Sequence, residues 1–73
     1  MTKQEIDKLI LAGEPLEMFF GSTKDIYSVG NYRITEKQFN EARKRFYGKL
    51  NFKINTGGFT RHIYTIKPQE NEQ

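Results

Sequence analysis

Two segments of this sequence begin with the same helix-start signature, and this repetition constrains the fold more than any other feature. Thr2 is followed three residues later by Glu5, and Thr35 is followed at the same spacing by Gln38. In such a capping box, the threonine hydroxyl and the side chain three residues later each accept a hydrogen bond from the other residue's backbone N–H. We therefore predict that two helices begin at these threonines.

Each predicted helix also has an apolar face and a glycine at its end. The apolar residues recur at helical spacing: Ile6, Leu9 and Ile10 in the first segment, and Phe39, Ala42 and Phe46 in the second. Gly13 and Gly48 are natural C-terminal caps, because glycine adopts a positive φ without steric cost. Together these signals predict helices over residues 2–12 and 35–47.

The remaining apolar segments alternate in the way that half-buried strands do. Residues 26–29 and 32–34 flank a Gly-Asn pair, and residues 50–55 and 59–66 flank the pair Gly57-Gly58. Both pairs suit two-residue turns that require positive φ, so we predict two antiparallel hairpins. Residues 16–20 are ambiguous: their aromatic residues favour a short strand, whereas the proline before them permits a short helix.

The second hairpin also carries a prediction of register. If Gly57-Gly58 forms a two-residue turn, Phe52 lies opposite Ile63 and Lys53 lies opposite His62. A slip of one residue would move every side chain to the other face of the sheet. This register places His62 and Tyr64 with Lys53 on the face that points away from the apolar side.

The predicted fold is therefore a single α+β domain over residues 1–67, followed by a polar, flexible tail over 68–73. It contains two helices and an antiparallel sheet in the order α-(β)-ββ-α-ββ, with a wing-like C-terminal hairpin. The order helix, strand, Gly-Gly turn and strand over residues 35–66 resembles the end of a winged-helix domain in topology. A hairpin stands where that domain has its preceding helix, and we assign no family.

Charge divides unevenly along the chain. Residues 1–36 carry a net charge of −2, whereas residues 37–67 carry eight bases and one acid, a net charge of +7. Such asymmetry points to an anionic partner, for which nucleic acid and an acidic protein surface are the two candidates. The alternative is a solvated surface that is basic but binds no particular partner.

Several classes of function are poorly supported. The sequence has no cysteine and one histidine, which excludes a Cys/His zinc site. It carries none of the glycine-rich phosphate loops, dinucleotide motifs or serine elbows of common enzymes, so we expect no enzymatic activity, no cofactor and no small-molecule substrate. No apolar stretch approaches the ~20 residues that cross a bilayer, and we expect a cytoplasmic protein that does not bind membranes.

We predict a small accessory or regulatory protein that binds nucleic acid through a basic helix and hairpin. Lysine and arginine would contact phosphates, while polar and aromatic side chains would supply any specificity. The candidate residues are Lys37, Asn40, Lys44, Arg45, Lys53, Arg61, His62 and Tyr64. An interaction module or inhibitor that binds an acidic surface of a host protein is the alternative function. Exposed hairpin edges also permit a homodimer, and a bias toward the residues of AT-rich genes suggests a phage or mobile element.

Overall fold

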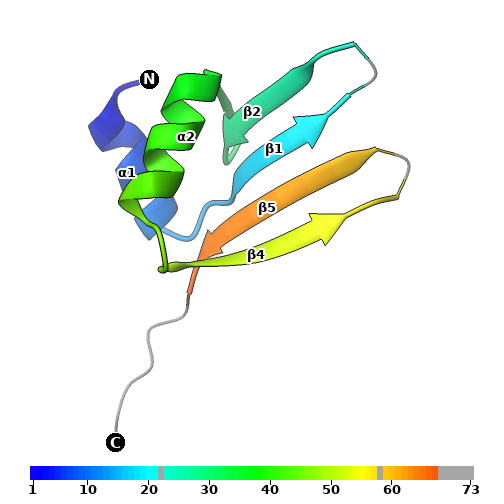
Figure 1. The fold of residues 1–73 in the computed structure, drawn as a ribbon. Helices are drawn as coiled ribbons and strands as arrows, with labels where there is room; N and C mark the ends of the chain where they lie inside the picture. Colours follow the sequence, from blue (N-terminus) through cyan, green and yellow to red (C-terminus); the bar gives the residue numbers. More distant parts are fainter. Residues whose placement is uncertain (22, 58, 68–73) are drawn as a thin grey trace, which may run out of the picture.

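The computed structural model describes residues 1–21, 23–57 and 59–67, and it has the predicted α+β architecture. Two helices pack over one face of a five-stranded antiparallel sheet whose strand order is β3-β2-β1-β5-β4 (Figure 1). The elements are α1 (Lys3–Leu11), β1 (Leu16–Phe20), β2 (Asp25–Val29), β3 (Tyr32–Ile34), α2 (Glu36–Arg45), β4 (Leu50–Asn55) and β5 (Thr60–Ile66).

Both predicted capping boxes are formed. The Thr2 hydroxyl accepts from the Glu5 backbone N–H at 3.1 Å, and the Glu5 carboxylate accepts from the Thr2 N–H at 2.8 Å. In the second box, both of the corresponding distances are 3.0 Å. The predicted helices are confirmed, although α2 ends two residues earlier than expected. Gly48 follows with a φ of 81°, which only glycine adopts readily.

The ambiguous segment 16–20 is a strand, and it is the central one. β1 pairs with β2 on one side and with β5 on the other, both antiparallel. Leu16 is fully buried, and Met18 packs against the core from the same face. Because strands border the segment on both sides, its backbone N–H and C=O groups form hydrogen bonds with both neighbours. A short helix here would have left the facing edges of β2 and β5 without these partners.

The core lies at one end of the sheet, beneath the helices (Figure 1). Among the described residues it consists of seven buried side chains from α1, from α2 and its C-cap, and from the neighbouring strands β1 and β2: Ile6, Ile10, Leu16, Val29, Phe39, Ala42 and Phe46. The other half of the same sheet face extends beyond the helices toward the β1–β2 and β4–β5 connections. Phe52 and Ile54 on this half are 51% and 50% exposed.

The predicted register of the last hairpin is wrong by one residue. Phe52 lies opposite Tyr64, and Lys53 lies opposite Ile63. Tyr64 therefore points to the helix side, where its ring lies 5.9 Å from that of Phe39. The packing of β5 between β1 and β4 sets this register, rather than turn chemistry alone. Gly58 of the predicted turn lies outside the described residues.

The C-terminal hairpin is joined to the sheet along its length instead of standing free as a wing. β5 pairs with β1 from Leu16 opposite Tyr64 to Phe20 opposite Thr60. The tail predicted over residues 68–73 lies outside the described residues. Neither described helix is long and apolar enough to cross a membrane.

Candidate nucleic-acid interface

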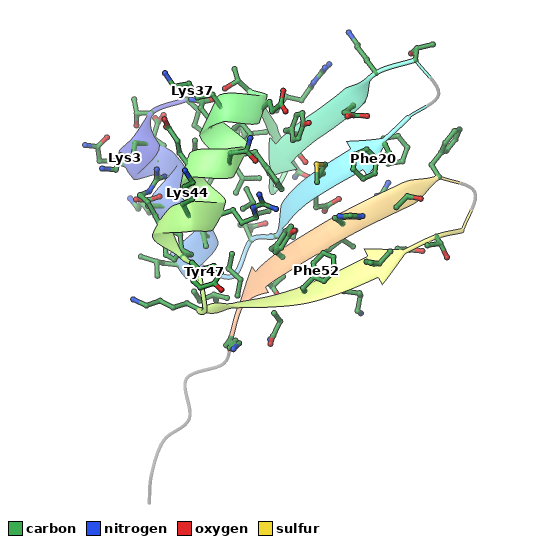
Figure 2. All side chains as sticks on the ribbon, in the orientation of Figure 1. Lys3, Phe20, Lys37, Lys44, Tyr47 and Phe52 are labelled. Atoms are coloured by element: carbon green, nitrogen blue, oxygen red, sulfur yellow. The ribbon has the colours of Figure 1, made fainter. Side chains whose placement is uncertain are left out.

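The eight residues predicted from the sequence do not lie on one surface. Lys37, Asn40 and Lys44 follow the exposed side of α2, where they line a shallow hollow together with Glu36 and Glu41. Figure 2 shows Lys37 and Lys44 pointing from α2 into solvent, away from the strands. This part of the predicted site is brought together, but two carboxylates lie among its cations.

Arg45 is held by the first helix. Its guanidinium forms a two-pronged ion pair with the Asp7 carboxylate, with Nε at 3.0 and 3.1 Å from the two oxygens. Both side chains are about three-quarters buried, and the pair joins α2 to α1. The sequence predicted Arg45 as a nucleic-acid-binding residue of the basic helix and did not indicate a carboxylate from the other helix. Its charge is therefore already compensated.

Lys53 and Arg61 lie on the face of the sheet opposite the helices. The register places both on that side, since their neighbours Phe52 and His62 point to the helix side. Arg61 Nε lies 3.6 Å from the Glu17 carboxylate, and its guanidinium lies 5.3 Å from the centre of the Phe19 ring. These two cations are thus separated from those of α2 by the thickness of the sheet.

His62 and Tyr64 belong to a row of rings on the helix side of the sheet. We call Phe20, His62, Phe52 and Tyr64 the aromatic row. Successive ring centres lie 5.0, 5.3 and 4.9 Å apart in that order. The row begins on the half of the sheet that extends beyond the helices and ends at the buried Phe39 beneath α2. Figure 2 shows Phe20 and Phe52 on this open half.

Tyr27 packs on the other side of Phe39, with ring centres 5.2 Å apart, and so continues the aromatic packing into the core. Desolvation raises the pKa of Tyr27, and the nearby carboxylates of Glu36 and Asp25 act in the same direction. Its hydroxyl therefore stays protonated at neutral pH, as do unperturbed tyrosines.

Arg43 joins α2 to the row, although the sequence did not single it out. Its guanidinium donates a hydrogen bond to the Tyr64 hydroxyl at 3.4 Å and lies 5.8 Å from the Phe39 ring centre. The only signal available beforehand was its position at the border of the apolar helix face. The sequence also gave no sign of the role of Phe52, because its alternating pattern predicted the apolar face of a half-buried strand.

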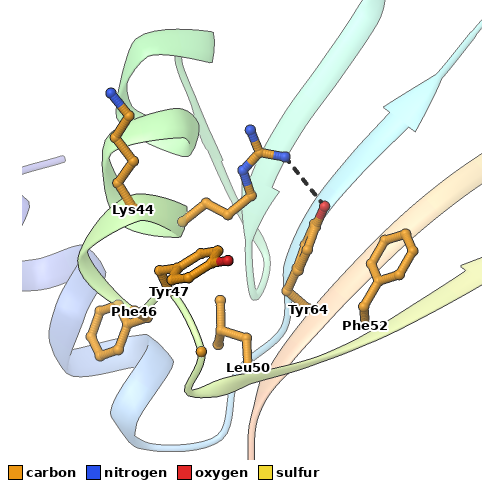
Figure 3. Close-up of a pocket in the computed structure, with 8 residues that line it drawn as sticks. Lys44, Phe46, Tyr47, Leu50, Phe52 and Tyr64 are labelled. Carbon is orange, nitrogen blue, oxygen red and sulfur yellow. Dashed lines mark hydrogen bonds between the residues drawn. The ribbon is translucent and has the colours of Figure 1, made fainter.

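A hollow of about 450 Å³ opens beside Arg43, where α2 runs into β4 (Figure 3). We call it the α2–β4 hollow. Its lining consists of Arg43, Lys44, Phe46, Tyr47, Gly48, Leu50, Phe52 and Tyr64. The Tyr47 side chain, which is 87% exposed, stands between the end of α2 and Tyr64.

Within the described part of the chain, only Arg45 and Arg61 form ion pairs within 4 Å. The cations of α2 that border the aromatic row, Arg43 and Lys44, therefore form no close ion pair with any carboxylate in the described part of the chain. The described residues also contain no group of three or more His, Cys, Asp or Glu side chains that could hold a metal ion.

Comparison of this chain with protein-family models, with curated proteins and with solved structures finds no match. Its function has to be inferred from its own residues.

Proposed function

We propose that this protein binds single-stranded nucleic acid along the aromatic row, with the cations of α2 on the phosphates. The observation that carries the proposal is the adjacency of the two features. Partly exposed rings border the same face of the sheet as Arg43 and Lys44, which form no ion pair with a described carboxylate. Stacking surfaces beside a line of positive charge are what sequence-tolerant single-strand binding requires.

The rings contribute the stacking part of the binding free energy. Phe52 is half exposed, and His62 and Tyr64 are partly accessible on either side of it. Base–aromatic stacking contributes about 1–3 kcal/mol per base, and every base has a face that can stack. A row of four rings thus provides affinity without demanding a particular sequence.

The cations contribute the part of the binding free energy that comes from phosphate contacts. Arg43 and Lys44 are neighbours in the last turn of α2. Each cation that neutralises a phosphate of a single strand contributes about −0.7 to the slope of log affinity against log salt. These two contacts predict a slope of about −1.4.

Single strands fit this surface better than a duplex. The exposed side of α2 interleaves Glu36 and Glu41 with Lys37 and Lys44. A helix inserted into a groove would bring these carboxylates against phosphates, which is unfavourable. The rings lie on a sheet face beside the helix, where they can reach unpaired bases but not stacked ones.

An acidic protein surface is the second candidate ligand. It is favoured by Ile54 and Phe59, which are 50% and 53% exposed and offer apolar area that a nucleic acid would not require. Aromatic and apolar side chains are enriched at the centre of protein interfaces.

Fluorescence anisotropy with labelled 12-nucleotide single strands of DNA and RNA, and with the matching duplexes, tests the proposal. The titrations are repeated from low to physiological salt. We expect tighter binding of single strands than of duplexes, with the negative salt slope given above. No binding at low salt, or affinity independent of salt, would refute nucleic-acid binding. Capture of a host protein that survives nuclease treatment would then favour the acidic partner.

A further inference from the structure

The α2–β4 hollow differs in shape and chemistry from the open surface of the aromatic row. It lies where the chain turns sharply after α2 at Gly48 and enters β4 at Leu50. Its volume of about 450 Å³ falls within the roughly 300–1,000 Å³ that ligand pockets occupy. A concave site at one end of the row can hold a group that the flat rings cannot.

The lining of the hollow combines rings with positive charge. Leu50 forms apolar wall, while Tyr47, Phe52 and Tyr64 provide ring surfaces on its sides (Figure 3). Arg43 and Lys44 are its charged residues, and no aspartate or glutamate of the described ranges lines it. The site therefore complements a flat, unsaturated group that carries a negative charge.

Tyr47 is the least expected part of this arrangement. It is 87% exposed, although burial of an aromatic ring is a large source of stability in a domain of this size. In the close-up, its side chain stands beside Leu50 and points toward Tyr64. A planar ligand between Tyr47 and the rings of β4 and β5 would cover surface that now faces solvent.

We propose that the α2–β4 hollow accepts one unstacked nucleobase of the bound strand, with the adjoining phosphate on Arg43 and Lys44. This inference rests on the proposed function, and it adds a defined position to an otherwise sequence-tolerant surface. The base lies against Tyr47 and Tyr64 above Leu50. The guanidinium and ammonium groups at the rim contact the phosphate.

The first experiment follows backbone and side-chain NMR signals of the labelled protein during titration with adenosine 5′-monophosphate, adenosine and inorganic phosphate. We expect the monophosphate to shift signals of residues 43–50, Phe52 and Tyr64, and to bind at least several-fold more tightly than either fragment. Equal shifts with phosphate alone would overturn the inference, because they would assign the site to charge without a base.

The second experiment compares Tyr47→Ala with the matched control Tyr32→Ala, which removes a 55% exposed tyrosine from β3 at the far edge of the sheet. We expect Tyr47→Ala to weaken binding of a 12-nucleotide strand by roughly five- to 150-fold, the range that one stacked base contributes. Tyr32→Ala should bind like the unsubstituted protein. Circular dichroism melts of both variants check that the fold is kept.

The failures of the two proposals are distinguishable. Salt-dependent binding of the strand that Tyr47→Ala leaves unchanged would overturn the pocket and leave single-strand binding intact. If the unsubstituted protein does not bind the strand, the proposed function is overturned. The inference of a pocket for a base of that strand is then overturned as well.

Discussion

The Arg43 guanidinium donates a hydrogen bond to the Tyr64 hydroxyl across 3.4 Å, which links the last turns of α2 to the inner end of the aromatic row. The contact places a permanent positive charge of α2 at the ring surface. Because both side chains remain partly accessible, the bond orders the charge without burying it. Under the proposed function, Arg43 would contact a bound strand as well as stabilise the fold.

Replacement of Arg43 and Lys44 by glutamine should weaken single-strand binding and reduce its salt dependence. The loss of two phosphate contacts should make the slope of log affinity against log salt less negative by about 1.4. Anisotropy titrations at several salt concentrations measure both quantities. Lys8→Gln, which removes one exposed charge from α1, is the control. An unchanged slope in the double variant would show that α2 does not contact the phosphates.

Two half-exposed phenylalanines on opposite faces of the sheet allow a test of which face binds. Phe52 is 51% exposed on the helix side, and Phe59 is 53% exposed and packs against Phe19 on the other side. Phe52→Ala should lower affinity for a single strand by roughly five- to 150-fold, while Phe59→Ala should leave it unchanged. The reverse result would place the binding surface on the outer face.

The Arg45–Asp7 pair should contribute to stability and not to binding. Both side chains keep about a quarter of their exposure, so we expect a coupling of about 1 kcal/mol or less between Arg45→Met and Asp7→Asn in a double-mutant cycle of urea unfolding. Strand affinity should stay the same in Asp7→Asn with its liberated arginine. A marked gain in affinity there would instead return Arg45 to the binding site.

Stability should fall in acid through the first capping box. The hydrogen bond from the Thr2 backbone lowers the pKa of Glu5 below its ordinary value of 4.5. A carboxylate with a lowered folded-state pKa contributes stability that is present above about pH 4.5 and is lost as the pH falls through the folded-state pKa. Urea unfolding of Glu5→Gln should therefore show a flatter pH dependence below 4.5. Curves that stay parallel to those of the original protein would contradict this.

The helices could be predicted from the sequence because their signals are local. The capping hydrogen bonds of Thr2 with Glu5, and of Thr35 with Gln38, lie within the first turn of each helix, and Gly48 acts on its own backbone. Local chemistry of this kind does not depend on the rest of the fold. The first hairpin was predictable for the same reason.

The register of β4 and β5 could not be predicted from the hairpin alone. The Gly-Gly pair permits more than one loop length, and the face that Tyr64 takes is decided by β1 beside it and Phe39 above it. Those contacts join residues distant in the sequence. The one-residue difference in register also places His62 on the helix side of the sheet. The predicted site residues of this hairpin therefore lie on two faces.

The candidate site was missed in part for a related reason. The pairing of Arg45 with Asp7 depends on how the two helices pack, and periodicity within one helix carries no information about it. The exposure of Phe52 likewise follows from where the helices stop along the sheet. An alternating pattern indicates a shared face but not which portion of that face is covered.

Because the seven-residue core sits at one end of the sheet, most of the open half contributes little to holding the molecule together. Side chains such as Phe52 and Ile54 can be exchanged without leaving a void beneath the helices. Under the proposed function, ligand preference could thus diverge quickly between related sequences while the scaffold stays constant. The rings at the exposed end are the positions where such divergence would first be seen.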